Sequence, residues 1–425
     1  MHFLYSVLLA VAFAFSAPFY LWKGRGTGKY LRTLGDRFAR SDDGLPAAGG
    51  KSIWIHAVSV GEVLAARALV QPLKARIPGY RVFVSTTTLT GNAIARETVR
   101  GADGIFFAPF DFAGPIDRLL DRVDPALVVL VETEIWPNLI HRARGRGARV
   151  AIVNGRISPR SFPRYRRARP VLRHVLAEID LFLMQGEAHR ERMLAMGAPP
   201  DRVHVTGNLK YDALLEPETP PALRRALGQD GAAPRPLWVA GSTVEGEEEA
   251  VLQAFAAVRE RIGDARLVIA PRRPERFAAV VEMVTRTGLA CARRTRLPEA
   301  GWTTGDVLVL DTLGELAQVY PLATVVFVGG SLVKAGGHNV LEPAVAGKAI
   351  VVGPHMENFQ EIAAAFLAED ALVQVRDAAA LTEAVLRLLA DPSARDAMGE
   401  RAREIVARNR GSLEHTVDAL ARLLA

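Results

Sequence analysis

The stretch SIWIHAVSVGEV, residues 52–63, decides the fold class of this chain. Its first seven residues form an apolar run that predicts a buried strand, and a helical pattern follows. Ser59 and Glu62 have the S-x-x-E spacing of a capping box, which marks a helix start. A glycine-containing loop at such a point usually binds phosphate on helix amides, and the Glu62 carboxylate would repel that ligand. Glu62 is therefore either a helix cap or a residue that does chemistry.

The same alternation of short apolar runs and longer amphipathic runs continues along the chain. It predicts an α/β fold with parallel sheets covered on both faces, as in doubly wound domains. In the first half we expect strands at residues 52–58, 81–85, 104–108, 127–132, 148–153, 180–184 and 203–206. In the second half we expect strands at residues 237–240, 265–270, 306–311, 324–328, 348–352 and 371–375.

The length of 425 residues exceeds what one hydrophobic core usually organises, so two domains are expected. The boundary falls in a segment rich in proline, glycine and charge, which predicts a linker around one short helix. Two α/β halves also predict a ligand cleft between them, beyond the carboxyl ends of the strands. The predicted parts are an anchor at 1–22, a first domain at 23–215, a linker at 216–236, a second domain at 237–405 and a C-terminal helix at 406–425.

Residues 3–22 (FLYSVLLAVAFAFSAPFYLW) carry no charge and are long enough to cross a bilayer. Lysines and arginines follow this run, at positions 23, 25, 29 and 32, rather than precede it. By the positive-inside rule these charges favour an uncleaved anchor with the rest of the chain in the cytoplasm. The alternatives are a signal peptide cleaved near Ser16 and Ala17, or a buried core helix.

Composition narrows the classes of function. The net charge of +7 favours anionic partners, which include nucleic acid, acidic lipid and phosphorylated substrates. The single cysteine, Cys291, excludes an intramolecular disulfide. No strand is followed by G-x-G-x-x-G and no P-loop motif occurs, which argues against a dinucleotide oxidoreductase and a P-loop NTPase. No D-x-D pair occurs, and His338 with Glu342 supplies only two ligands, so no metal is expected.

The densest basic stretch of the chain is residues 160–173, which contain six arginines. It lacks the regular aromatic residues of a nucleic-acid platform. Beside a membrane anchor it favours contact with anionic lipid phosphates, and an ordinary solvated face is the alternative.

Polar residues follow several strands of the second half. Arg272 follows the strand that ends at Ala270, and its guanidinium group can form paired hydrogen bonds with a phosphate. The alternative is that the charged segment around Arg272 is simply solvated. Glu342 follows two glycine pairs and either completes a helix cap with Asn339 or binds ribose hydroxyls. The segment 311–315 follows a further strand. It is either a nucleotide contact or an ordinary turn. All three segments follow strands of the same predicted sheet and should lie at its carboxyl edge. This position favours a nucleotide site.

In the first half, Glu132 and Glu134 close a strongly apolar strand together with Trp136. Burying an unpaired charge is costly, so these carboxylates are either used or lie in an exposed polar loop. Lys210 follows the last strand of this half, near the expected cleft or on the surface.

Seven motifs together, in this order, resemble the 3-deoxy-D-manno-octulosonic acid (Kdo) transferases of Gram-negative bacteria. The resemblance implies a membrane-anchored glycosyltransferase of the GT-B fold that moves Kdo from CMP-Kdo to the lipid A precursor, lipid IVA. It implies no cofactor, no metal and location at the inner membrane. The motifs are HAVSVGE (56–62), ETEIWPN (132–138), NGRIS (154–158), GNLKYD (207–212), GSTVEGEEE (241–249), PRRPER (271–276) and GGHNVLEP (336–343).

The resemblance also implies a role for each matching position. Glu62 corresponds to the catalytic base, while Glu132 and Lys210 correspond to auxiliary catalytic residues. We expect acceptor binding and desolvation to raise the pKa of Glu62 against the helix dipole. The positions that correspond to CMP contacts are Pro271, Arg272, Leu313, Gly314, Glu315, Asn339, Val340, Leu341 and Glu342. The implied partners are CMP-Kdo, the lipid A precursor and inner-membrane lipid, and no nucleic acid.

Three other functions remain open from the sequence. The first is a different GT-B enzyme, a transferase or epimerase that uses a UDP-sugar. The second is a membrane-anchored nucleotide-binding scaffold without turnover. The third is a peripheral nucleic-acid binder drawn to membranes by its basic face.

Overall fold

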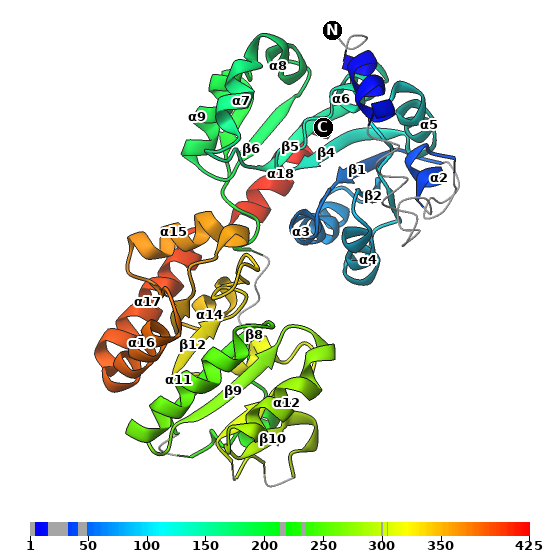
Figure 1. The fold of residues 1–425 in the computed structure, drawn as a ribbon. Helices are drawn as coiled ribbons and strands as arrows, with labels where there is room; N and C mark the ends of the chain where they lie inside the picture. Colours follow the sequence, from blue (N-terminus) through cyan, green and yellow to red (C-terminus); the bar gives the residue numbers. More distant parts are fainter. Residues whose placement is uncertain are drawn as a thin grey trace. The chain divides into compact units, whose positions relative to one another are not determined.

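The computed structural model describes residues 5–15, 33–40, 49–212, 218–231, 235–298, 301–303 and 305–425. The chain forms two compact units (Figure 1). Unit 1 comprises residues 1–213 and 409–425, and unit 2 comprises residues 214–408. The last helix therefore returns to the unit in which the chain begins.

Unit 1 is built on a seven-stranded parallel sheet in the order β3-β2-β1-β4-β5-β6-β7. The order reverses between β1 and β4, which is the switch point where doubly wound sheets bind ligands. The strands are β1 (Ser52–His56), β2 (Arg81–Thr86), β3 (Gly104–Phe107), β4 (Pro125–Val131), β5 (Arg149–Gly155), β6 (Leu181–Met184) and β7 (Val203–Val205).

Helices cover both faces of this sheet because its side chains alternate between two apolar clusters. Trp54 packs with residues of α5, α6, α8 and α9, whereas Ile53 and Ile55 pack with residues of α3, α4 and α18. The helices are α2 (Leu34–Arg37), α3 (Val60–Arg76), α4 (Leu89–Thr98), α5 (Ala113–Val123), α6 (Pro137–Gly145), α7 (Phe162–Arg167), α8 (Arg169–Leu176), α9 (Glu187–Met196) and α18 (Ser412–Leu424), with the 3-10 turn η1 (Pro200–Arg202).

Unit 2 repeats the plan with a parallel sheet in the order β10-β11-β9-β8-β12-β13-β14. Its switch point lies between β8 and β12. The strands are β8 (Leu237–Thr243), β9 (Arg266–Pro271), β10 (Cys291–Arg293), β11 (Val307–Val309), β12 (Val325–Val328), β13 (Ala349–Val352) and β14 (Val373–Gln374).

Trp238 and Phe255 anchor a core cluster between this sheet and α11, α12 and α16. The helices of unit 2 are α10 (Pro221–Ala226), α11 (Glu248–Arg261), α12 (Phe277–Arg286), α13 (Leu316–Val319), α14 (Leu341–Val345), α15 (Gln360–Ala368), α16 (Ala378–Ala390) and α17 (Pro392–Arg408). Its 3-10 turns are η2 (Pro274–Arg276), η3 (Arg294–Arg296), η4 (Tyr320–Leu322) and η5 (Glu357–Phe359).

The predicted parallel α/β architecture is confirmed, and each predicted strand overlaps an observed one. Among the described residues the sequence prediction missed one strand, β10. It has three residues, two of them Cys291 and Ala292, and pairs on one side only, with β11. The helix α10, within the predicted linker, is part of unit 2. The Trp302 amide donates to the Ala226 carbonyl of α10 at 2.7 Å.

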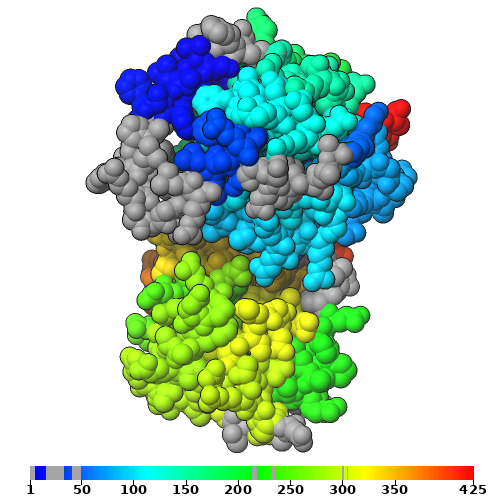
Figure 2. Space-filling model, turned by 90° about the vertical axis from the view of Figure 1, so that its right-hand side faces the viewer, coloured from blue at the N-terminus to red at the C-terminus, as the bar shows by residue number. Residues whose placement is uncertain are grey.

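The predicted anchor, residues 1–22, is only partly described. Residues 5–15 are helical, while residues 1–4 and 16–22 lie outside the described residues. This helix lies on the surface of unit 1, dark blue in Figure 2. Tyr5 donates to Asp111 at 3.0 Å, and Phe13 packs edge-on against Phe110 and Phe112. Within the described parts of the chain, we find no helix of the length and apolarity that crossing a membrane requires.

Candidate functional site

Glu62 lies in the first turn of α3, beside the switch point of unit 1, and is 6% exposed. Its Oε1 accepts the Ser59 hydroxyl and its Oε2 accepts the Val58 backbone N–H, each at 2.7 Å. Ser59 occupies the cap position of α3, yet its side chain makes no cap hydrogen bond. The capping-box alternative is therefore wrong as a pair of reciprocal bonds, because Ser59 and Val58 both donate to the carboxylate instead.

Burial raises the pKa of Glu62 to about 7, despite the opposing hydrogen bonds from Ser59 and Val58. The negative charges of Glu134 and Glu132 raise it further. Burial in the protein therefore already raises the pKa of Glu62, in the direction that we expected from desolvation; the effect of acceptor binding stays a prediction. A buried carboxyl whose pKa lies near neutrality has the property of a general base.

Glu132 follows β4 with a left-handed backbone, φ +61°, which is rare for a residue with a side chain. Its carboxylate pairs with Arg156 Nε at 3.0 Å and with Lys210 Nζ at 3.8 Å. The segment before Lys210 is fixed by Asn154, whose Oδ1 accepts the Leu209 N–H at 3.0 Å. The structure thus brings Lys210 to Glu132, and Glu132 lies within electrostatic reach of Glu62.

A chain of side-chain contacts leads to Glu134. The Trp136 indole N–H donates to Glu134 at 2.8 Å, and the His56 ring meets the Trp136 ring edge-on at 4.6 Å. His56 Nδ1 bonds the Ser85 hydroxyl at 2.8 Å, which also accepts the Trp54 indole N–H at 2.7 Å. Burial lowers the pKa of His56 to about 3, so this imidazole is neutral. Burial also raises the pKa of Glu134.

An apolar pocket of about 380 Å³ opens beside Glu134. Its walls come from the loop after β4, from α7 and α8, and from the helix of residues 5–15. Apart from Glu134 its lining is largely apolar or aromatic, formed by Tyr5, Thr133, Ile135, Pro137, Tyr165, Ala168, Val171, Leu172 and Val175. This volume lies at the lower end of the range for small-ligand sites.

In unit 2, Arg272 follows β9 and lies within electrostatic reach of His338 and Glu342. Burial raises the pKa of Glu342, while the Asn339 amide, which donates to it at 3.1 Å, and the charge of Arg272 lower it. Asn339 Oδ1 also accepts the Leu341 N–H at 3.1 Å, but the cap position of α14 is Val340 and not Asn339, so the predicted N-cap is wrong. His338 precedes α14 and does not share a helix face with Glu342.

Leu313, Gly314 and Glu315 follow β11, the neighbour of β9, so their segment shares the carboxyl edge with Arg272. Leu313 is 74% exposed, and Gly314 has φ +83°, which favours glycine. Glu315 pairs with Arg294 at 2.9 Å and accepts the Thr312 hydroxyl at 2.6 Å. Within the described residues, no hydrogen bond or ion pair joins this segment to Glu342.

Glu247 lies in the motif GSTVEGEEE (241–249), and the sequence predicts no role for it. It is fully buried, and its carboxylate accepts the backbone N–H groups of Gly330 at 2.6 Å, Val244 at 2.9 Å and Leu332 at 3.3 Å. These donors belong to the loops after β8 and β12, on the two sides of the switch point of unit 2. Glu247 therefore locks the loops that lead to His338.

Among the described residues, no group of three or more histidine, cysteine, aspartate or glutamate side chains could hold a metal ion. The sites of unit 1 and unit 2 consist of carboxylates, basic side chains and backbone amides at strand ends. Such groups can move a proton and neutralise an anion.

The family matches and the two α/β units together define the class of this protein, a glycosyltransferase with a GT-B-like fold. Residues 305–405 match the family described as glycosyl transferases group 1. UDP-GlcNAc 2-epimerase from Neisseria meningitidis, solved with UDP-GlcNAc, covers 84% of this chain and 99% of its own at a TM-score of 0.56. At 14% sequence identity this similarity shows the fold alone.

The chain belongs to the 3-deoxy-D-manno-octulosonic-acid transferase (kdotransferase) family, which residues 32–213 match. A 3-deoxy-D-manno-octulosonic acid transferase of Haemophilus influenzae is 34% identical over 92% of this chain and 91% of that protein. One of Bordetella pertussis is 36% identical over 94% of each chain. The predicted family is confirmed.

Proposed function

We propose that this protein is an inverting transferase that moves Kdo from CMP-Kdo to the lipid A precursor, lipid IVA, in lipopolysaccharide synthesis. Membership of the Kdo transferase family supports the donor sugar. The observation that carries the mechanism is Glu62, a buried carboxyl with a pKa of about 7 at the switch point of unit 1. No resident metal or cofactor is part of the proposal.

In the proposed step, the ionised Glu62 carboxylate takes the proton of an acceptor hydroxyl. The freed oxygen electron pair forms the bond to C2 of Kdo, and the bond from C2 to the phosphate oxygen of CMP breaks. CMP leaves with the electron pair of the broken bond. A pKa near the working pH suits this role, because the base is then ionised and still accepts a proton readily.

Lys210 and Glu132 are proposed as auxiliary catalytic residues. The ammonium group of Lys210 would neutralise the Kdo carboxylate or the charge that develops during transfer. Its ion pair with Glu132, and the pair of Glu132 with Arg156, support a held position for the ammonium.

Donor binding is proposed for the carboxyl edge of unit 2. Arg272 would pair with the CMP phosphate, with Pro271 placing it at the end of β9. The carboxylate of Glu342 suits the ribose hydroxyls, and the exposed Leu313 offers an apolar contact to the base. The other proposed contacts are Gly314, Glu315, Asn339, Val340 and Leu341.

The acceptor side is supported by unit 1. The apolar pocket beside Glu134 shares helices α7 and α8 with the exposed arginines at positions 164, 166, 167, 169 and 173. Apolar walls next to cationic side chains suit an acceptor that carries both acyl chains and phosphates. Lipid IVA has both.

We also propose that residues 1–22 anchor the protein in the inner membrane, with both units on the cytoplasmic side. Several apolar side chains of the described helix face outward, among them Leu8 at 60% and Phe15 at 83% exposed. The basic residues that follow residue 22 support the orientation.

The test is transfer from CMP-Kdo to lipid IVA by the full chain and by Glu62→Gln. General-base catalysis contributes about 10²- to 10⁴-fold, so the variant should lose about that much activity. Glu187→Gln is the matched control, because Glu187 is an exposed glutamate of α9. Equal rates for wild type and Glu62→Gln would refute the base. No transfer by the wild type, with turnover of a UDP-sugar instead, would refute the donor.

A further inference from the structure

A second pocket, of about 260 Å³, lies in unit 2 at the amino edge of the sheet. Thr324 and Lys348 line it directly before β12 and β13, and Arg235 lines it two residues before β8. The proposed donor residues follow the strands instead. Strands of four to seven residues separate the two edges by roughly 13–23 Å, so this pocket is distinct from the proposed donor site.

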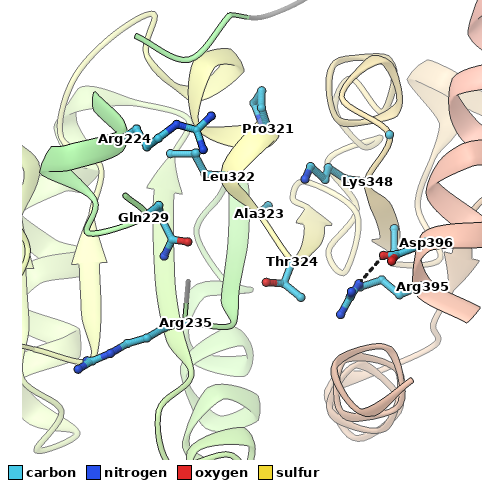
Figure 3. A pocket seen from close by; sticks show the side chains of 12 residues that line it. Arg224, Gln229, Arg235, Pro321, Leu322, Ala323, Thr324, Lys348, Arg395 and Asp396 are labelled. Atoms are coloured by element: carbon cyan, nitrogen blue, oxygen red, sulfur yellow. Dashed lines mark hydrogen bonds and ion pairs between the residues drawn. The ribbon is translucent and has the colours of Figure 1, made fainter. Parts of the chain in front are cut away.

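The pocket has a strong excess of positive charge. Its lining contains Arg224, Arg235, Lys348 and Arg395 against a single carboxylate, Asp396. Figure 3 shows Arg224, Lys348 and Arg395 turned toward the space between them, with Arg395 paired to Asp396 at 2.8 Å. Within the described residues, no ion pair is formed by Arg224, Arg235 or Lys348, so most of this charge is uncompensated.

Lys348 is the central cation of the pocket. Burial lowers its pKa; the charge of Asp396 opposes this shift, and the charges of Arg395 and Arg224 add to it. The two arginines therefore face Lys348 closely enough to repel it. An anion among the three groups would remove this repulsion.

Gln229 supplies an unsatisfied donor. Its side chain lines the pocket and is 6% exposed, and its amide nitrogen has no hydrogen-bond partner. Buried donors are nearly always paired, because an unpaired donor keeps the cost of losing its contact with water. An acceptor oxygen in the pocket would satisfy this nitrogen.

Close packing holds the pocket in shape. A side chain at Gly399 of α17 would come within 2.1 Å of the Gly347 carbonyl oxygen, so α17 lies directly on the turn before Lys348. Gly347 has φ +65°, which favours glycine. Lys348 is thus presented by tightly packed backbone rather than by a loose loop.

We propose that this pocket binds a phosphate-bearing anion at a second site of unit 2. Several cations and one amide donor around a small polar space match the many acceptor oxygens of a phosphate group. The phosphate can belong to a free compound, such as pyrophosphate, or to the headgroup of an anionic lipid. The proposal does not depend on the identity of the transferred sugar.

The test measures pyrophosphate binding to the full chain by calorimetry in chloride buffers of constant ionic strength. A parallel arm measures binding to vesicles of phosphatidylcholine with and without phosphatidylglycerol. Saturable binding in at least one arm is expected, with Lys348→Met and Arg224→Gln each weakening it about tenfold or more. Arg376→Gln, an 89% exposed arginine of the same unit, is the control and should bind as the wild type does.

The two arms distinguish the sources of the phosphate. Pyrophosphate binding supports a free compound, and dependence on phosphatidylglycerol without pyrophosphate binding supports a lipid headgroup. The pyrophosphate titration is repeated with saturating CMP, which fills the proposed donor edge: a signal that survives belongs to the amino-edge pocket, whereas a signal that disappears would assign the anion to the donor edge and overturn the proposal. Binding in neither arm, or equal binding by Lys348→Met, would also overturn it. Thermal unfolding of each variant checks that the loss is not a loss of folding.

Discussion

The Ser59 hydroxyl donates to Oε1 of Glu62 at 2.7 Å. The residue at the cap position of α3 therefore hydrogen-bonds the carboxylate and not the helix backbone. This bond and the Val58 N–H favour the ionised form, while burial and the charge of Glu134 favour the protonated form. The pKa of about 7 is the balance of these effects. Changing one group at a time should therefore move the pH dependence of activity in a direction that the structure specifies.

Ser59→Ala should raise the pKa of Glu62, because it removes a donor to the charged form. A hydrogen bond to a charged group contributes about 1.5–3 kcal/mol, so the acid limb of kcat/KM should move upward by about one to two pH units. The measurement is a pH–rate profile of Kdo transfer. Asp377→Ala, which removes the side-chain cap of α16, is a control for loss of a cap and should leave the limb in place. An unmoved limb in Ser59→Ala would contradict Glu62 as the titrating base.

Glu134→Gln should shift the same limb in the opposite direction. The charge of Glu134 raises the pKa of Glu62, so its removal should lower that pKa and extend activity to lower pH. Glu187→Gln removes an equal charge on exposed α9 and should have no effect. A shift of Glu134→Gln to higher pH would mean that Glu134 acts mainly through its bond to Trp136, and the electrostatic account would be wrong.

Much of the fold was predictable, because apolar strands and amphipathic helices alternate with clear periods. The residues of β10 lack that signal, since one of its three residues is arginine and pairing with β11 defines the strand. The site was predictable only as a set of polar strand ends. Which ends meet depends on strand order, which no local pattern contains.

Long-range pairs show this limit. Lys210 reaches Glu132 only because the chain after β7 returns toward β4, and Asn154 fixes that return. Glu247 accepts the Gly330 amide from 83 residues away. The motif around Glu247 indicated importance, but its role became clear only when both loops were placed.

Glu62→Gln should stabilise the protein above pH 7 while it lowers transfer by about 10²- to 10⁴-fold. The pKa of Glu62 is raised from 4.5 to about 7 on folding, so stability is fully present below pH 4.5 and is lost as pH rises through 7. That loss is roughly 3 kcal/mol, and Gln avoids it but gives up the Val58 hydrogen bond, worth about 1 kcal/mol. The expected gain at pH 8 is about 2 kcal/mol.

Calorimetry of wild type and Glu62→Gln at pH 8 and at pH 4.5 measures this difference. The unfolding midpoint of Glu62→Gln should be higher than that of the wild type at pH 8 and slightly lower at pH 4.5, where mainly the cost of the lost Val58 hydrogen bond remains. Glu187→Gln should match the wild type at both values. A variant that is less stable at pH 8 would show that the carboxylate is not strained by burial.

Gly329→Ala should disrupt the loops that Glu247 holds in unit 2. A side chain at Gly329 would lie 2.5 Å from Glu247 Oε1 and 2.6 Å from the Ser242 carbonyl oxygen, and backbone cannot yield as a flexible side chain can. Displacing the carboxylate would leave buried amides unpaired, each at a cost of about 1–3 kcal/mol. The unfolding midpoint of unit 2 should fall by several degrees, and CMP binding should weaken.

Gly263→Ala is the matched control for this prediction, because nothing lies within 4 Å of the added carbon. Its φ is not in the left-handed region, so alanine should be neutral or slightly stabilising there. If Gly329→Ala has the unfolding midpoint and the CMP affinity of the wild type, the hydrogen bonds of Glu247 to these loops are unnecessary for the donor site. If it keeps the midpoint but loses CMP affinity, the loops after β8 and β12 shape the site without contributing to stability.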